Sequence, residues 1–421
     1  MKSKIFNPGV FKASVRCIVI MISLMLCVSV SAASKRQLAI GQKVFEKMQE
    51  AQLELEQDNY AGATSLLNEI LGDESLNSFE KAQTWSLHGN VYFHMERFDL
   101  ALESFKKAVS FDGLPEGFLQ ISLRTVAQLS FMQDEYADAL KYASRLIEVS
   151  ETPDAGSYML KAQIYYKMED YSLALKDGLF AIDIERKAGN IIKENWLLVI
   201  NAIYYSMENF AGMVDTLKEL IELYPKDDYV KNLAAIYGQM DQTEKQLLLM
   251  EPLYDKGFLE SESELVNLAQ LMLMHKVPYK AAQVIESAFQ KGSVKRSKRN
   301  LELLAQSWQL AAHEEESVKY LAEAAKIEED GNLYVRLAQS YMNLYQWKEA
   351  ENALAKALKL GELDREGDTY LLLGMVRFYQ KEYPSARKAF REASGFENTS
   401  RLADQWVAYL DQEKAKEEAA Q

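Results

Sequence analysis

Residues 85–108, WSLHGNVYFHMERFDLALESFKKA, decide the fold of this chain. Large and small side chains recur here at helical spacings: Gly89 lies four residues after Trp85, and Ala101 lies four residues before Phe105. Side chains three and four residues apart share one face of a helix, so the stretch predicts two amphipathic helices joined by a short polar turn. The small side chain lets the two helices approach closely, and the large ones fill the groove beside it.

The same spacing recurs in other parts of the chain. It is found at Tyr370, Leu373, Gly374, Tyr383, Ala386, Phe390 and Ala393, and at Tyr334, Leu337, Ala338, Tyr341, Trp347, Ala350, Leu354 and Ala357. The small residue of the first helix can be followed through Ala51, Gly89, Ala127, Ala162, Asn201, Ala234, Ala269, Ala305, Ala338 and Gly374, with a mean spacing of about 36 residues. This pattern resembles the tetratricopeptide repeat (TPR) family. The resemblance implies an all-α, right-handed superhelix, an α-solenoid of about ten helical hairpins whose neighbours stack into one apolar core.

The repeat divides the chain into segments. We expect an N-terminal array of about six repeats at 33–240, a C-terminal array of about four repeats at 241–398, and a capping helix with a charged tail at 399–421. Trp406 and Leu410 are predicted to face inward from that helix. The sixth unit is the least regular, since Thr243 replaces the usual aromatic residue and Pro252 follows it. We expect a distortion and a division between two arms there.

The first 32 residues have the layout of a secretory signal peptide. Basic residues, an apolar run from Cys17 to Val30 and the small residues Ser31 and Ala32 follow one another. The run is short for a membrane span, which needs about 20 residues, although an uncleaved anchor remains an alternative. Both cysteines, Cys17 and Cys27, lie in this segment. We therefore expect a periplasmic protein that lacks disulfides once the leader is removed.

Composition and motifs favour a protein without catalytic activity. The net charge of −14 argues against a nucleic-acid partner, because phosphate binding needs clustered Lys and Arg. The sequence shows no Gly-rich phosphate loop, nucleophile elbow or zinc-protease motif, so we predict no catalytic residue, metal site or cofactor. His88 occupies a core position of the repeat, with a ligand role as the alternative. His313 and the glutamates that follow it are expected to be solvated in a turn.

One basic run stands out in a predicted loop between hairpins. It comprises Lys291, Lys295, Arg296, Lys298 and Arg299. A solvated loop is the simplest interpretation, and contact with an acidic partner or an anionic membrane surface is the alternative.

A candidate peptide-binding groove follows from the first helices, which line the concave side in TPR proteins. The residue after each small one is an amide in seven of the ten units: Gln52, Asn90, Gln128, Gln163, Gln270, Gln306 and Gln339. Aromatic residues follow three positions later, as in Phe93, Phe131, Tyr166 and Tyr205. Amides can pair with an extended backbone, and aromatic rings can anchor side chains. We predict binding by Asn90, Phe93, Gln128, Phe131, Gln163, Tyr166 and Tyr205. The alternative is that amides are simply common at this position of the repeat, without a role in binding, and that the rings pack between neighbouring hairpins.

The basic clamp with which some TPR domains hold a C-terminal carboxylate is not evident. Arg124 occupies one groove position, but the supporting Lys and Asn residues are missing. Recognition of a partner's chain end is therefore disfavoured.

A narrower resemblance involves the second half of the chain. Residues 251–286 (EPLYDKGFLESESELVNLAQLMLMHKVPYKAAQVIE), 300–310 (NLELLAQSWQL) and 330–344 (DGNLYVRLAQSYMNL) resemble bacterial TPR proteins that accompany TonB, ExbB and ExbD. This implies an accessory role in TonB-dependent transport of iron siderophores, with protein partners from that complex. Membrane contact would come only through partners or an uncleaved leader. A scaffold for envelope or polysaccharide assembly is the alternative, and an enzyme with an unrecognised site is a third.

Overall fold

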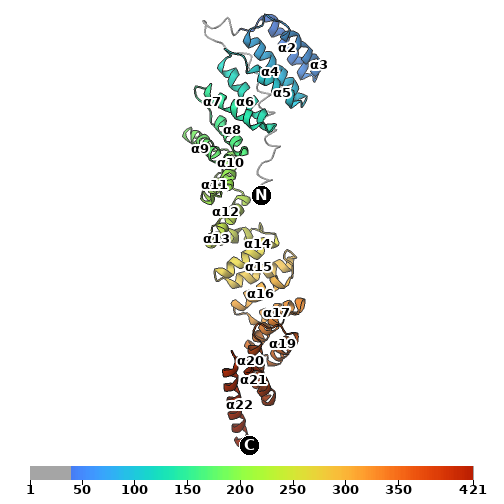
Figure 1. The fold of residues 1–421 in the computed structure, drawn as a ribbon, viewed down its shortest axis with the longest axis vertical. Helices are drawn as coiled ribbons and strands as arrows, with labels where there is room; N and C mark the ends of the chain where they lie inside the picture. Colours follow the sequence, from blue (N-terminus) through green and yellow to red (C-terminus); the bar gives the residue numbers. More distant parts are fainter. Residues whose placement is uncertain (1–38, 421) are drawn as a thin grey trace. The chain divides into compact units, whose positions relative to one another are not determined.

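The computed structural model describes residues 39–420, and the predicted signal peptide at residues 1–32 lies outside this range. The described residues form helices and turns, with no strand among them (Figure 1). Consecutive helices pair as ten antiparallel hairpins, and one more helix follows the last hairpin. The predicted all-α repeat fold is confirmed.

The helices agree with the predicted register of the repeat. The first five hairpins are α2 (Gln42–Glu56) with α3 (Tyr60–Leu71), α4 (Ser78–His94) with α5 (Phe98–Ala108), α6 (Glu116–Met132) with α7 (Tyr136–Glu148), α8 (Ala155–Lys167) with α9 (Tyr171–Lys187), and α10 (Glu194–Ser206) with α11 (Phe210–Leu223). The next five are α12 (Asp227–Gln239) with α13 (Thr243–Asp255), α14 (Glu262–Met274) with α15 (Pro278–Lys291), α16 (Lys298–Leu310) with α17 (Glu314–Glu328), α18 (Gly331–Asn343) with α19 (Trp347–Leu360), and α20 (Glu366–Tyr379) with α21 (Tyr383–Ser394). The final helix is α22 (Ser400–Ala420).

The chain divides into two compact units inside α12. The first unit ends at Tyr229 and the second begins at Val230, whereas the sequence pattern predicts the boundary between residues 240 and 241. Pro252 does not end α13, which continues to Asp255. In the second unit one apolar cluster extends from Ala234 to Ala389, so the hairpins there share a continuous core.

Small residues set the distance between the two helices of a hairpin. Gly89 of α4 faces Phe105 of α5, and a Cβ at this glycine would lie 2.8 Å from the phenyl ring. Phe105 is completely buried, as are Ala127 and Ala162 at the equivalent positions of the next two hairpins. Close packing of a large residue against a small one therefore repeats along the stack.

Every hairpin turns through one residue in the left-handed region. These residues are Asp58, Glu96, Asp134, Glu169, Glu208, Asp241, Lys276, Ala312, Tyr345 and Lys381, and each lies seven positions after the small residue of its hairpin. Side-chain caps then start several of the following helices: Asn59 accepts a hydrogen bond from the Gly62 amide at 3.2 Å. The turn geometry is thus a fixed part of the repeat, although its side chains vary.

The predicted capping helix is confirmed. Leu410 of α22 is buried against the last hairpin, and the indole of Trp406 stacks on Phe390 with ring centroids 5.4 Å apart. Thr399 precedes the helix and donates a hydrogen bond to the Ala393 carbonyl at 2.6 Å. This helix covers the apolar face that the last hairpin would otherwise expose.

Candidate functional site

The predicted groove residues all lie on first helices of the first unit, but the structure does not leave them equally accessible. Asn90 and Gln163 are buried, with 3% and 9% of their surface exposed, and Gln128 is half-buried. Tyr205 is 36% exposed. The amide row of hairpins two to four is therefore largely covered, and Tyr205 is the most accessible of the predicted residues.

The predicted aromatic anchors pack within their own hairpins. Phe93 lies against Phe98 with ring centroids 5.4 Å apart, and Phe131 lies against Tyr136 at 5.9 Å. Tyr166 packs in the same way against Tyr171, the first residue of its partner helix, with ring centroids 5.9 Å apart. Phe93 and Phe131 are buried, so their rings brace the hairpin turn instead of lining an open groove. Both rings also belong to apolar clusters shared with the next hairpin, Phe93 with Leu123 and Phe131 with Leu160, as the alternative interpretation expected.

Two amide oxygens of the predicted row have no hydrogen-bond partner. They are Oδ1 of Asn90 and Oε1 of Gln128, at equivalent positions of neighbouring hairpins, and both atoms are buried. A buried acceptor without a donor costs roughly 1–3 kcal/mol unless water or another molecule satisfies it. These oxygens are free to accept hydrogen bonds if the covering side chains move.

The same row is more accessible in the second unit. Gln270, Gln306 and Gln339 follow the small residues of α14, α16 and α18, and all three are exposed. None of their side-chain amides makes a hydrogen bond to the described part of the chain. The sequence marks these residues as amides of the repeat, but it does not show that they are better exposed than their counterparts in the first unit.

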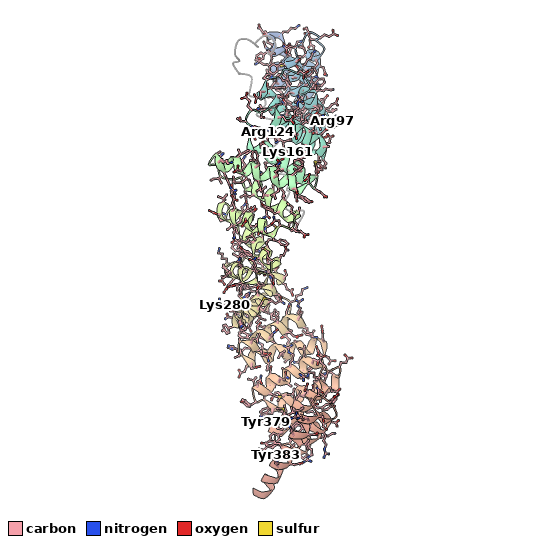
Figure 2. All side chains as sticks on the ribbon, turned by 60° about the vertical axis from the view of Figure 1, so that its left-hand side comes forward. Arg97, Arg124, Lys161, Lys280, Tyr379 and Tyr383 are labelled. Carbon is pink, nitrogen blue, oxygen red and sulfur yellow. The ribbon has the colours of Figure 1, made fainter. Side chains whose placement is uncertain are left out.

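Arg124 is already engaged within the first unit. Its guanidinium pairs with Asp154, which caps α8, and donates a hydrogen bond to the Ser157 hydroxyl at 3.0 Å. Figure 2 shows Arg124 on the same stretch of the first unit as Lys161. This arginine links neighbouring hairpins, so its guanidinium is held in place by the fold.

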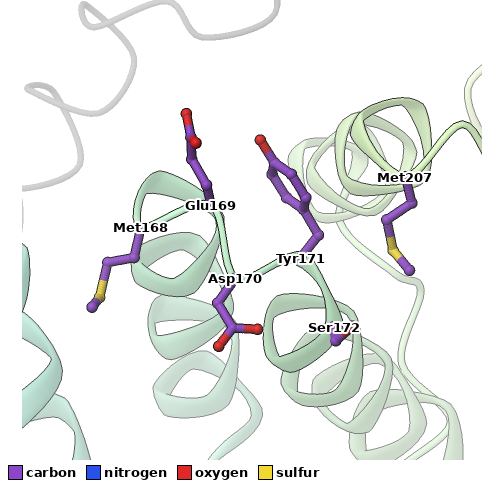
Figure 3. A pocket seen from close by; sticks show the side chains of 6 residues that line it. All are labelled: Met168, Glu169, Asp170, Tyr171, Ser172 and Met207. Atoms are coloured by element: carbon purple, nitrogen blue, oxygen red, sulfur yellow. The ribbon is translucent and has the colours of Figure 1, made fainter.

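A small open pocket, which the sequence pattern does not predict, lies at the turns of the fourth and fifth hairpins (Figure 3). It has a volume of about 540 Å³ and is lined by Met168, Glu169, Asp170, Tyr171, Ser172 and Met207. Figure 3 shows Glu169 and Tyr171 extending to the same side of the turn. Asp170 instead caps α9 by accepting a hydrogen bond from the Leu173 amide at 3.2 Å.

The two histidines singled out in the sequence have different surroundings. His88 is buried between the rings of Trp85 and Tyr92, at 5.5 and 4.9 Å, and its Nε2 lies 3.3 Å from Oδ1 of Asn68. Burial, and then the charge of Lys107, lower the pKa of His88. Its core position is confirmed. His313 lies at the turn, as expected, and is partly solvated: its ring packs against Tyr279 and Trp308, while 42% of its side chain is exposed.

The basic run between α15 and α16 is partly engaged by the chain itself. Arg296 donates to Glu323 at 2.7 Å, and Lys298 contacts Glu328 and Asp330 at 2.9 Å each. Arg296 thereby binds the loop to α17, and Lys298 connects α16 with α17 and with Asp330, the residue that caps α18. Across residues 39–420, no three His, Cys, Asp or Glu side chains gather as a metal site would require. Within the same range, no helix has the length and apolar character needed to cross a bilayer.

Comparison with known proteins identifies the repeat. One tetratricopeptide repeat model matches residues 74–113, and another matches residues 335–397. No curated protein matches the chain.

Among solved structures the chain is similar to a tetratricopeptide repeat protein from Parabacteroides merdae, at 16% identity over 63% of this chain and 99% of the other, with a TM-score of 0.39. It is also similar to a chain in the structure of Naa15/Naa10 bound to HypK-THB, at 13% identity over 90% of this chain and 67% of the other, with a TM-score of 0.43. A third is the TPR2AB domain of yeast Sti1 in a complex with pHSP90, at 14% identity over 70% and 99%, with a TM-score of 0.30. The chain carries tetratricopeptide repeats in both of its compact units.

Proposed function

We propose that this protein is a non-catalytic scaffold that binds extended segments of other proteins along the first helices of its repeats. The observation that carries the proposal is the exposure of Gln270, Gln306 and Gln339 at one position of three successive hairpins. Each amide can donate to and accept from a peptide backbone, so a row of them can pair with an extended chain. The TPR fold supports this role, because stacked hairpins offer such a surface without a catalytic cleft.

The groove predicted in the first unit remains part of the proposal. Tyr205 is accessible there, and the unpartnered oxygens of Asn90 and Gln128 lie on the same row. Binding in this unit requires a small shift of the covering side chains, whereas binding in the second unit does not. We therefore place the stronger contact on the second unit.

A photo-crosslinking amino acid at position 306 tests this surface in intact cells. The expected result is capture of a defined partner protein, identified by mass spectrometry. The matched control carries the same amino acid at Glu315, which is also exposed but lies on the second helix of the hairpin. Equal capture from both positions would show that the amide row is not the binding surface.

We further propose that the scaffold works in the periplasm as an accessory component of TonB-dependent uptake. The signal-peptide layout of residues 1–32 supports export, and the resemblance of residues 251–286, 300–310 and 330–344 supports the TonB association. Under this proposal the captured partner is a TonB, ExbB or ExbD component. Capture of a polysaccharide synthase or exporter instead would favour the alternative role in envelope assembly.

Export is tested separately. The full chain is expected in the periplasmic fraction, shortened by removal of a leader that ends near Ala32. A variant without residues 2–32 should stay in the cytoplasm and should lose capture of periplasmic partners. Periplasmic recovery of the shortened variant would contradict the assignment of residues 1–32 as the export signal.

A further inference from the structure

An exposed tyrosine occupies a strained turn in the ninth hairpin, in the second unit. Tyr345 has a φ angle of 55°, in the left-handed region, and 76% of its surface is exposed. At the equivalent turn position the other nine hairpins carry eight charged residues and one alanine. A bulky side chain at positive φ costs free energy, and such outliers cluster at functional sites. The packing of the hairpin does not explain why a tyrosine stands here.

The turn residue of other hairpins binds the start of the following helix. In the first hairpin the Tyr60 hydroxyl donates to Asp58 at 2.8 Å, and the third hairpin has the same bond at 2.5 Å. In the ninth hairpin both of these positions are aromatic, as Tyr345 and Trp347, and the Tyr345 hydroxyl makes no hydrogen bond within residues 39–420. The ninth turn therefore has exposed aromatic surface in place of an internal hydrogen bond.

The aromatic surface continues into the tenth hairpin. The rings of Tyr345 and Trp347 meet edge to face, with centroids 5.8 Å apart and planes at 80°. Trp347 in turn stacks on Tyr379 of α20, with centroids 4.7 Å apart and planes at 13°. Tyr379 is 50% exposed, and Figure 2 shows it near Tyr383, where α20 passes into α21. We call Tyr345, Trp347 and Tyr379 the aromatic edge.

A network of ionic and hydrogen-bonding contacts fixes the stacked pair. Glu351 lies one turn after Trp347 on α19, and its carboxylate accepts from Arg377 of α20 at 2.9 Å and from Gln380 at 3.2 Å. Lys348 also contacts this carboxylate, at 3.3 Å, and only 12% of the Glu351 side chain is exposed. The contacts join α19 to α20 beside the rings, so the surface is formed before a partner binds. Because two cations neutralise the carboxylate, it does not favour a charged partner.

The aromatic edge offers ring surface and hydrogen-bond donors, which suit a proline-rich segment. Proline has a compact apolar ring and no N–H, so a polyproline II helix needs few acceptors from its binding site. Its carbonyls are free to accept from the hydroxyls of Tyr345 and Tyr379, neither of which has a hydrogen-bond partner in the described part of the chain. Aromatic-lined grooves bind such segments in several protein classes, because the preformed helix loses little conformational entropy.

The geometry favours a proline-rich segment over a glycan. A sugar ring stacks on a flat aromatic face, and its hydroxyls require several donors and acceptors. The planes of Tyr345 and Trp347 instead form a corner, into which a compact ring fits. Two of the amides that flank the rings in the sequence, Asn343 and Gln380, already donate to carboxylates of the chain. The polar groups that a sugar needs are thus partly in use.

We propose that the aromatic edge is a docking site for a proline-rich segment of a partner protein in the polyproline II conformation. One proline ring lies in the corner between Tyr345 and Trp347, and another packs against the exposed part of Tyr379. Backbone carbonyls of the segment accept from the two tyrosine hydroxyls. The strained conformation of Tyr345 is retained because its ring completes the corner.

This inference deepens the proposed scaffold function, because it names the chemistry of one partner segment, and it rests on that function. The two are tested separately. A failed peptide titration would leave the amide row and its crosslinking test standing. A failed crosslink at position 306, together with binding at the aromatic edge, would leave a scaffold that binds through this edge alone.

The experiment is a titration of the purified full chain with an acetylated and amidated decaproline peptide. The readout is the indole N–H resonance of Trp347 in the chain labelled with ¹⁵N-tryptophan, assigned by its loss in W347F. Decaproline is expected to shift this resonance in a saturable way. An alternating glycine–serine peptide of the same length, which offers backbone carbonyls without proline rings, should leave it in place.

Two variants locate the contact. Tyr345→Asn and Tyr379→Leu should each weaken decaproline binding about fivefold, because each removes one aromatic contact. Asparagine suits the left-handed turn, so loss of binding in that variant does not result from unfolding. The control is Tyr279→Leu, which removes a tyrosine of similar exposure, 47%, from the seventh hairpin and should change the affinity less than about twofold. Circular dichroism checks that each variant is folded.

Four results would overturn the proposal. The first is no shift of the Trp347 resonance with decaproline at millimolar concentrations. The second is an equal shift with the glycine–serine peptide, which would indicate a contact that does not depend on proline. The third is equal weakening by Tyr379→Leu and Tyr279→Leu, which would place the contact elsewhere. The fourth is tighter binding of chitohexaose, a neutral glycan, which would assign the aromatic edge to carbohydrate.

Discussion

The phenyl ring of Phe105 occupies the space that a side chain on Gly89 would need. A Cβ at Gly89 would lie 2.8 Å from this ring, closer than carbon atoms pack in folded proteins. Gly374 and Phe390 have the same relationship in the last hairpin. The absence of a side chain at these two positions therefore sets the separation of the helices in each hairpin.

Gly89→Ala is expected to destabilise the first unit by about 1–3 kcal/mol, because Phe105 is completely buried and has no free space to move into. Thermal unfolding followed by circular dichroism measures the change. Gly117→Ala serves as the control, since nothing lies within 4 Å of its added Cβ. That variant should keep or raise the stability, by up to about 1 kcal/mol, because alanine favours a helix over glycine. Similar losses in both variants would contradict the packing argument.

Tyr345 combines backbone strain with exposure. Its φ angle is 55°, in the left-handed region, and 76% of its surface is exposed, so little packing compensates for the strain. Tyr345→Asn should raise the free energy of unfolding by about 0.5–1 kcal/mol, because asparagine adopts this conformation more readily.

A β-branched residue provides the opposite test at the same position. Tyr345→Val should lower the unfolding free energy, because branching at Cβ disfavours positive φ. Urea unfolding of both variants gives the comparison. Destabilisation by asparagine would show that the tyrosine ring contributes more than the strain costs, and stabilisation by valine would contradict the argument from strain.

His88 makes the stability of the first unit depend on pH. Burial lowers the pKa of His88 in the folded chain, so the unfolded chain takes up this proton first as the pH falls. The stability gained by keeping His88 neutral is complete above pH of about 6.5 and decreases as the pH falls toward the folded pKa. His88→Leu should therefore lose part of the decrease in melting temperature between pH 7 and pH 5.

The control for this measurement is His94→Gln, at an exposed position of the same helix. Its melting temperature should change between pH 7 and pH 5 by the same amount as that of the wild-type protein. If His88→Leu retained the whole wild-type decrease, other groups would be responsible for the loss of stability in acid.

Trp406 secures the final helix. Its ring stacks on Phe390 and also contacts Phe378, at 5.6 Å between centroids. Trp406→Ala is expected to destabilise the attachment of α22 by about 3 kcal/mol, in the range for removing a large aromatic side chain from a packed site. Hydrogen exchange should accelerate over residues 400–412 first. Leu402→Ala, at a half-exposed position of the same helix, should leave exchange nearly unchanged.

The sequence predicted the hairpins and the capping helix correctly because their determinants are local. A small residue such as Ala127 or Gly374 and its large neighbours act within one pair of adjacent helices, so their spacing alone specifies the hairpin. The core position of His88 could be predicted in the same way, since the repeat register fixes which side of a helix faces inward.

The exposure of individual side chains to solvent could not be predicted from the repeat register. Gln163 and Gln306 occupy the same position of their repeats, yet the first is buried and the second exposed. Phe93 was expected in the groove but packs against Phe98, because the turn places these two rings together. Side chains of neighbouring helices decide such differences, and the repeat pattern does not specify them.

The sequence by itself therefore determined the type and order of the helices and their approximate number, through side-chain spacings that act within one hairpin. Only the tertiary structure decided which polar and aromatic groups remain available to a partner. The contact of Trp347 with Tyr379 joins two different hairpins, and the exposure of these rings depends on how the hairpins stack. Burial and hydrogen bonding depend on every neighbouring atom, and the stacking of the chain brings those atoms together.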